Sequence, residues 1–101
     1  MNDPLVVVLQ RRAIREIEEI DRWWRHNRPA SPDLFLRELE SMLAVTALMP
    51  TVGAAARGER APGLRRVLLR RTRYHLYYRV IGEVLEVLAV WHARRGKGPG
   101  L

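Results

Sequence analysis

His75 and His92, near the C-terminus, are the side chains of this sequence best suited to acid–base chemistry. Arg73 lies two residues before His75, and Arg94 and Arg95 follow His92 directly. Imidazole exchanges protons near neutral pH, and guanidinium binds oxyanions in a fixed fork. Nearby guanidinium groups also favour neutral imidazole, which can then act as a base or a hydrogen-bond partner. The set could therefore move a proton or hold a phosphate or carboxylate.

Several other chemistries are excluded by residue type. The chain has no cysteine, and its three histidines lack the spacing of zinc ligands, so we expect no metal site. No glycine-rich loop of the phosphate-binding kind is present, and we expect no cofactor. The two serines, Ser31 and Ser41, read as a helix cap and a mid-helix residue, so no nucleophile stands out.

Positive charge is concentrated in the second half of the chain. Residues 1–50 hold seven Arg against eight Asp and Glu, which gives −1, whereas residues 51–101 hold ten Arg and one Lys against three Glu, which gives +8. A preference for arginine codons explains why Arg outnumbers Lys but does not explain where the charge lies. A concentrated cationic surface favours a polyanionic partner, either nucleic acid or an acidic protein segment.

The first half of the chain predicts a strand and a helical hairpin. Leu5–Leu9 is a continuous β-branched and leucine run, typical of a strand buried on both faces. A helical apolar stripe follows over about residues 11–27. A second helix begins after Ser31, a suitable N-cap, and continues until Pro50. So short a link requires the two helices to lie antiparallel.

The second half predicts a loop over residues 51–63 and then three strands, Leu64–Arg71, Arg73–Ile81 and Val84–His92. The order β-α-α-β-β-β indicates an α+β fold, with the helical hairpin packed on a small, mostly antiparallel sheet. We expect a single domain over 1–101, in which 93–101 is a flexible basic tail.

The last two strands allow a register to be predicted. Gly82 suits the first position of a two-residue II′ turn, which pairs Ile81 with Val84. If this pairing continues without a break, Arg79 faces Glu86 and Arg73 faces His92. Strand alternation then sorts the side chains into an apolar face, made of Tyr74, Leu76, Tyr78, Val80, Leu85, Val87, Ala89 and Trp91, and a polar one, made of Arg73, His75, Tyr77, Arg79, Glu86, Leu88, Val90 and His92.

This register makes His75 and His92 diagonal neighbours on an open face of the sheet. They are either half-exposed strand residues or the centre of a site with the arginines. For Arg79 a cross-strand ion pair with Glu86 is favoured over a functional role. Trp23, next to Trp24 on one helix, is either a partly exposed packing residue or a partner contact.

The C-terminal third resembles one known family. The segments Arg65–Arg70, Tyr74–Val80 and Val84–Gly96, with a tyrosine-rich strand that ends in an arginine and a Trp-His pair before a basic tail, resemble the RelE/ParE toxins of type II toxin–antitoxin systems. These toxins include the plasmid stabilisation proteins, and the ParE-like branch is the more similar one. The order of elements and the chain length agree with this family.

The resemblance implies a toxin that inhibits DNA gyrase by binding. The alternative is a ribosome-dependent mRNA endoribonuclease of the RelE type, for which the candidate catalytic residues are His75, His92 and Arg95. In that branch an arginine tends to stand where this chain has His75, and Leu101 occupies the end where the nucleases carry Tyr or His. The residues expected to contact the target are Arg73, His75, Tyr77, His92, Arg94 and Arg95.

The resemblance also implies a cognate antitoxin. We expect an acidic, amphipathic segment that folds against the helical hairpin and the sheet, and we expect operator DNA to be reached only through the antitoxin. Met1–Pro4 has no basic region, and Leu5–Leu9 is too short for a signal-peptide core, so a cytoplasmic protein without membrane association is expected. A nucleic-acid-binding adaptor also fits the composition and ranks last.

Overall fold

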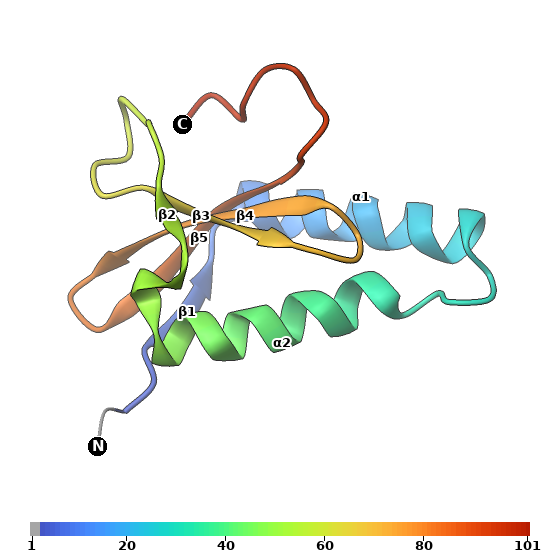
Figure 1. Cartoon of the computed structure of the whole chain (residues 1–101), viewed down its shortest axis with the longest axis horizontal. Coiled ribbons are helices and arrows are strands. Elements are labelled where there is room, and N and C mark those ends of the chain that lie inside the picture. The colour runs from blue at the N-terminus through green and yellow to red at the C-terminus, as the bar shows by residue number, and fades with distance from the viewer. Residues whose placement is uncertain (1–2) are drawn as a thin grey trace.

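The computed structural model describes residues 3–101, so Met1 and Asn2, part of the start expected to lack a signal peptide, lie outside the described residues. Two antiparallel helices, α1 (Arg11–Asn27) and α2 (Leu34–Leu48), lie along one side of a five-stranded sheet (Figure 1). The strands and the short 3₁₀ helix are β1 (Val6–Leu9), η1 (Pro50–Val52), β2 (Ala54–Ala55), β3 (Arg65–Leu69), β4 (Tyr74–Ile81) and β5 (Val84–His92).

The sheet order is β1-β5-β4-β3-β2. β1 runs parallel to β5, and every other neighbouring pair is antiparallel. The predicted α+β class and the predicted order of the main elements are confirmed. The additional β2 lies in the region predicted as a loop, because two alanines there pair with Arg65 and Arg66 at the edge of the sheet.

The helical hairpin differs from its prediction at one end. α1 has the predicted bounds, but α2 begins at Leu34, with Asp33 as its cap residue and no side-chain capping bond. Ser31 is therefore not the N-cap. Its N–H donates to the Arg28 carbonyl and its own carbonyl accepts from Leu34, at 2.9 and 3.3 Å, so these residues are used to reverse the chain before the second helix starts.

The main core lies between the helices and the sheet. Phe35 and Leu39 of α2 and Ala13 of α1 are buried against β4 and β5, where Leu76 and Tyr78 are fully covered. The Phe35 and Tyr74 rings pack edge to face, with 5.3 Å between centroids. Burying side chains of this size contributes roughly 1.5–3 kcal/mol each, which is how the helical hairpin is held on the sheet.

The Tyr78 hydroxyl fastens the segment after α2 to the sheet. It donates to the Pro50 carbonyl at 2.7 Å and accepts from the Gly53 N–H at 2.9 Å. Burial raises the pKa of Tyr78, against the opposing effects of the Gly53 hydrogen bond and the Arg65 charge. A Cβ on Gly53 would lie 2.5 Å from this hydroxyl, so the contact requires glycine.

β1 was predicted to be buried on both faces, and this is wrong. It forms an edge of the sheet, where Val6, Val7 and Val8 are 62, 38 and 42% exposed. A run of β-branched residues predicts a strand, but it does not distinguish a central strand from an uncovered edge strand.

A β-bulge changes the predicted register of the last hairpin. The predicted pairs Ile81–Val84 and Arg79–Glu86 are present, and Gly82 has the positive φ of 59° that its turn requires. Tyr78 then pairs with Val87 but Tyr77 with Ala89, which leaves Leu88 without a partner. One inserted residue moves every following side chain of β5 to the opposite face of the sheet.

The second face of the sheet is partly covered. Beyond the bulge, Ala89 and Trp91 turn to this face, where Ala89 and Tyr77 join Ala61 and Leu64 of the preceding loop in a small second core. Leu101 packs at its margin. The predicted open polar face is therefore wrong over this region, because part of the loop and the end of the chain pack on it.

Candidate functional site

An open groove at the β3 edge of the sheet brings several arginines and one histidine together. It has a volume of about 540 Å³ and includes Arg66 from β3, Arg70 and Arg73 from the β3–β4 turn, and His75 from β4. β3 is uncovered here because β2 pairs only with Arg65 and Arg66. The remaining lining residues are Met42, Val52, Ala54, Val67 and Leu68. We call this the arginine groove.

The turn that supplies two of these arginines is held by Glu38 of α2. Its carboxylate accepts the backbone N–H groups of Arg71 and Thr72 at 2.7 and 2.9 Å, and the Thr72 hydroxyl at 2.6 Å. Arg73 adopts a left-handed backbone with φ of 70°, and its N–H closes the turn on the Leu69 carbonyl at 2.8 Å. The carboxylate thus fixes the backbone from which the guanidinium groups extend.

His75 lies in an environment that favours its neutral form. Burial lowers the pKa of His75, and the positive charges of Arg66 and Arg73 lower it further. A protonated imidazole would lose hydration and meet two like charges. At neutral pH this side chain can therefore accept or donate a hydrogen bond without carrying charge.

His92 lies in a different pocket, between α1 and the sheet. This pocket has a volume of about 480 Å³, and its lining residues are Glu16, Glu19, Ile20, Trp23, Tyr74, Val90, His92 and Arg95. The His92 ring packs edge to face on Tyr74, with 5.0 Å between centroids, and its Nδ1 accepts the Arg94 N–H at 3.1 Å. Burial raises the pKa of Tyr74, although Trp24 and Arg95 oppose the shift. We call this the His92 pocket.

Glu16 in this pocket accepts a backbone hydrogen bond from β5 at a position where no neighbouring strand does so. β1 ends beside Val87, so the part of β5 beyond it has no strand on that side. The Glu16 carboxylate accepts the Val90 N–H at 3.1 Å and contacts Arg12 at 3.4 Å. Both of its oxygens are therefore engaged in structural contacts.

The predicted neighbourhood of His75 and His92 is wrong. His75 pairs with Trp91, whereas His92 pairs with Tyr74, which packs on the helices. The two imidazoles consequently lie on opposite faces of the sheet, one in the arginine groove and one in the His92 pocket. The extra residue at Leu88 causes this separation, so the two histidines do not form one acid–base site.

The other predicted contact residues are distributed between these regions. Arg73 lies in the arginine groove with His75, as predicted, but Tyr77 is only 5% exposed and offers little surface to a partner. Arg94 is exposed, and the Arg95 guanidinium stacks on Trp91 at 4.1 Å from the ring centroid. The roles of all these residues in target binding stay predictions.

The tail over 93–101 returns toward the second face of the sheet. The Trp91 indole N–H donates to the Lys97 carbonyl at 2.6 Å, and Leu101 reaches the second core. A Cβ on Gly58 would meet Leu101 backbone at 3.0 Å, which shows how closely loop and tail approach. The flexibility expected of this tail stays a prediction.

Arg79 has the structural partner that its position predicts. Its Nε contacts the Glu86 carboxylate at 2.7 Å, and the other Glu86 oxygen accepts from Gln10 at 2.8 Å. Both side chains of the pair are partly covered. These contacts join β4, β5 and the residue between β1 and α1, and they leave Arg79 outside both candidate regions.

Sequence reasoning did not identify Glu38, Arg66 and Arg70 as members of the site. Glu38 lies 34 residues from Thr72, so nothing in the local pattern indicates their hydrogen bonds. Alternation along β3 could have indicated that Arg66 and Arg70, four residues apart, lie on the same face. The observed pairing of Arg66 with Tyr77 places His75 on that face as well.

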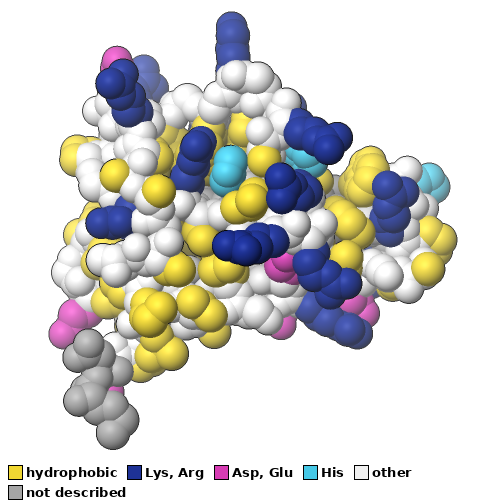
Figure 2. All heavy atoms as spheres, viewed as in Figure 1, with side chains coloured by type: hydrophobic (Ala, Val, Ile, Leu, Met, Phe, Trp, Pro, Cys, Tyr) yellow, Lys and Arg dark blue, Asp and Glu magenta, His cyan; other side chains and the backbone are white. Residues whose placement is uncertain are grey.

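Figure 2 shows Lys and Arg side chains gathered around histidine side chains over much of one face, with few acidic ones among them. Hydrophobic side chains gather lower on the same face, toward the C-terminal half of α2. Within residues 3–101 no cluster of three metal-ligating side chains occurs. Over the same residues, no helix has the length and apolarity needed to cross a membrane.

A helical hairpin on one side of a five-stranded mixed sheet, with basic clusters at the sheet, is an arrangement found in small bacterial toxins of the RelE/ParE type. The model of the family described as the ParE toxin of the type II toxin–antitoxin system matches residues 7–96. The chain therefore belongs to this family, and it is a type II toxin of the ParE/RelE superfamily. No curated protein matches the chain.

Solved structures share the fold over most of the chain. The chromosomal ParDE system from P. aeruginosa gives a TM-score of 0.70 at 19% identity, covering 89% of this chain and 97% of the other. The RelBE2 complex of Mycobacterium tuberculosis gives 0.61 at 26% identity, covering 89 and 99%. The intact E. coli RelBE complex gives 0.58 at 25%, covering 90 and 99%. These are toxin–antitoxin systems, which supports a cognate antitoxin as a partner.

Proposed function

We propose that the protein inhibits DNA gyrase by binding, without a chemical step of its own. The observation that carries this proposal is the separation of His75 and His92 onto opposite faces of the sheet. Membership of the ParE family supports the same reading. We expect Arg73 and His75 in the arginine groove, and His92, Arg94 and Arg95 at the other end of β5, to form the contact surface, with the complex located in the cytoplasm.

Cleavage of messenger RNA in the ribosome is the second candidate. Its support is the neutral imidazole of His75 between Arg66 and Arg73, which could serve as a base beside a phosphate. Against it, the lining of the arginine groove contains no carboxylate, and Tyr77, whose ring centroid is 6.0 Å from that of His75, is only 5% exposed and does not line the groove. RNA cleavage therefore ranks below inhibition by binding.

The test is a supercoiling assay with purified gyrase, relaxed plasmid and increasing amounts of toxin. We expect supercoiling to stop or cleaved plasmid to accumulate, and we expect the cognate antitoxin to reverse the effect. The double variant His75→Ala/His92→Ala adds a separate readout. If transcripts are cut in cells that express the unchanged toxin and stay intact in cells that express the variant, the protein is a nuclease. Unimpaired gyrase at a large excess of toxin would refute the proposal.

The antitoxin contact is proposed at the apolar end of the molecule. Val45 and Leu48 on α2, and Met49 just after it, are 41, 54 and 57% exposed. This end of α2 lies beside the start of β1, since the Leu5 N–H donates to the Ala47 carbonyl at 2.9 Å. The exposed Val6 of β1 and Leu48 line one pocket. An amphipathic antitoxin segment could cover this surface with its apolar side and reach the basic half with its acidic side.

Leu48→Asp tests this contact, because the side chain is exposed and its replacement should leave the fold intact. We expect the dissociation constant for the antitoxin to rise by at least tenfold, while inhibition of gyrase stays unchanged. Ile14→Asp is the matched control, since Ile14 is 40% exposed but lies on α1. Equal affinity of Leu48→Asp and the unchanged toxin would move the antitoxin to another surface.

A further inference from the structure

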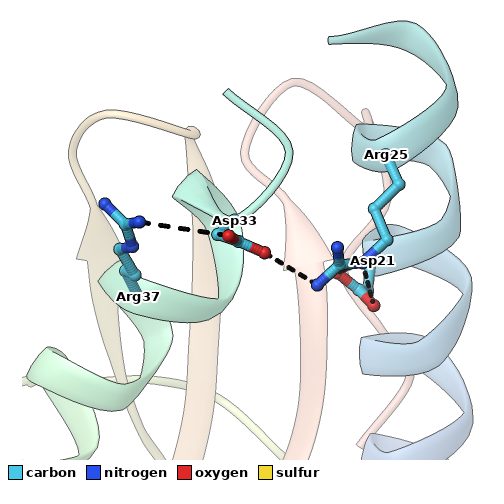
Figure 3. Close-up of polar contacts among 4 residues, drawn as sticks. All are labelled: Asp21, Arg25, Asp33 and Arg37. Atoms are coloured by element: carbon cyan, nitrogen blue, oxygen red, sulfur yellow. Dashed lines mark hydrogen bonds and ion pairs between the residues drawn. The ribbon is translucent and has the colours of Figure 1, made fainter. Parts of the chain in front are cut away.

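The arginines of this protein are of two kinds. Some arginines of the helices contact nearby carboxylates: Arg25 contacts Asp21 and Asp33 at 3.1 and 2.8 Å, and Arg37 contacts Asp33 at 3.9 Å (Figure 3). Asp21 raises the pKa of Arg25 through a hydrogen bond and its charge. Arg12 is similarly close to Glu16, at 3.4 Å. These guanidinium groups already have anionic partners.

The arginines of the groove have no such partners. Within the part of the chain that the structure describes, Arg66, Arg70 and Arg73 form no ion pair. Glu38 contacts the turn itself, but its oxygens accept backbone N–H groups and the Thr72 hydroxyl instead of guanidinium. The fold thus uses an acid to fix the turn while leaving the positive charges available.

The chemistry of the groove fits a phosphate backbone. Guanidinium binds phosphate through two parallel hydrogen bonds, and three such groups in one groove can contact successive phosphates. The groove lining has no Trp, Tyr or Phe to form a stacking platform for unpaired bases, and its one ring is the imidazole of His75. This absence favours a duplex, which presents phosphates and keeps its bases paired.

An amphipathic acidic peptide fits less well. Such a segment needs exposed apolar surface, and most of that surface lies elsewhere, at Leu48, Met49 and Val6. In the groove, Met42 and Val67 already pack against the core of the protein itself. Of the lining residues, Val52 is the large apolar side chain that is well exposed, at 39%, and it stands beside three guanidinium groups.

We propose that the arginine groove binds the phosphate backbone of double-stranded DNA through Arg66, Arg70 and Arg73. The choice of DNA over duplex RNA rests on the proposed action at gyrase, which holds a DNA segment. A toxin that contacts both would bind the gyrase–DNA complex more tightly than gyrase alone, because the two contacts add within one assembly.

The experiment measures fluorescence anisotropy of a labelled DNA duplex of about 20 base pairs titrated with the full-length protein at 50 and 200 mM salt. Each neutralised phosphate contributes a slope of about −0.9 in log K against log salt, so three give about −2.7. Over the fourfold change in salt, affinity should fall about 40-fold. A single-stranded oligonucleotide of the same length should bind more weakly, because the groove lacks a stacking platform.

Two triple variants make the test specific to the groove. Arg66→Gln/Arg70→Gln/Arg73→Gln removes the free arginines, and Arg12→Gln/Arg25→Gln/Arg37→Gln removes paired ones. Each variant lowers the net charge from +7 to +4, and circular dichroism melting checks that each one folds. We expect the first to lose binding and nearly all of the salt slope, and the second to keep both.

Three results would overturn the inference: no DNA binding by the unchanged protein, equal losses in the two variants, or groove-dependent binding of a glutamate-rich peptide in place of DNA. The outcome is separate from that of the proposed function. If DNA binding fails while gyrase is still inhibited, only this inference falls. If DNA binds at the groove and gyrase is unaffected, the proposed function falls.

Discussion

Replacing Glu38 by alanine should lower the free energy of unfolding, because this partly buried carboxylate holds the β3–β4 turn through hydrogen bonds. Its carboxylate accepts three hydrogen bonds from the β3–β4 turn, at 2.7, 2.9 and 2.6 Å. Hydrogen bonds to charged groups contribute about 1.5–3 kcal/mol each when buried, and leaving a buried donor unpaired costs about 1–3 kcal/mol.

The exposure of each hydrogen-bond donor decides how much stabilising free energy the Glu38→Ala variant loses. Arg71 is exposed, so water can replace the carboxylate at its N–H, but Thr72 is only 5% exposed and its two donors would be left without a partner. We therefore expect the free energy of unfolding to fall by about 2–3 kcal/mol, nearly all of it from Thr72. In a domain of this size, this corresponds to a loss of about 8–24 °C in Tm.

The assay is urea denaturation, with amide hydrogen exchange at Arg71 and Thr72 as a local readout. Glu40→Ala is the control, because Glu40 is exposed on the same helix, and Thr72→Val should cost about 1 kcal/mol by removing one bond. If Glu38→Ala costs less than about 0.5 kcal/mol and exchange at both amides is unchanged, the reasoning about this turn is refuted.

Three further predictions follow from contacts elsewhere. Tyr78→Phe should lower the free energy of unfolding by about 1–3 kcal/mol, because it leaves the Pro50 carbonyl and the Gly53 N–H without their partner. Tyr77→Phe should change this free energy little, and urea denaturation of the two variants makes the comparison. Because the pKa of His75 is lowered in the folded state, the unfolded chain binds the proton more readily. The free energy of unfolding should therefore fall as the pH drops from the ordinary pKa of about 6.5 toward the lowered one. Denaturation curves at pH 7.5 and 5.5 should show a smaller fall for His75→Gln. Arg94→Gln/Arg95→Gln should reduce toxicity in a growth assay while antitoxin binding measured by calorimetry is kept, and full toxicity of that variant would remove the tail from the contact surface.

Local patterns predicted most of the fold, because each element has its own signal. The spacing of apolar residues in α1 predicted a helix with the observed bounds, and Gly82 predicted the turn that sets Ile81 opposite Val84. The pairing of Arg79 with Glu86 followed from that turn. Such signals depend only on residues close together in the chain.

The arrangement of the site could not be predicted in the same way. Leu88 has the same β-forming character as its neighbours, so alternation does not indicate that it lacks a pairing partner. The predicted register, continued past Leu88 without a break, therefore placed His92 on the wrong face of the sheet. The covering of the second face depends on the packing of Ala61 and Leu101, which are distant in sequence from the strands that they cover. The role of Glu38 likewise depends on a contact across 34 residues.

The central claim is that this toxin acts by binding gyrase and does not cut RNA, and one coupled transcription–translation reaction on a relaxed plasmid with added gyrase tests it directly. Plasmid topology and the integrity of the transcript are read from the same sample after toxin is added, with and without antitoxin. We predict relaxed or cleaved plasmid beside full-length transcript, and recovery of supercoiling when antitoxin is present. Normally supercoiled plasmid beside a transcript cut within its reading frame would contradict the claim.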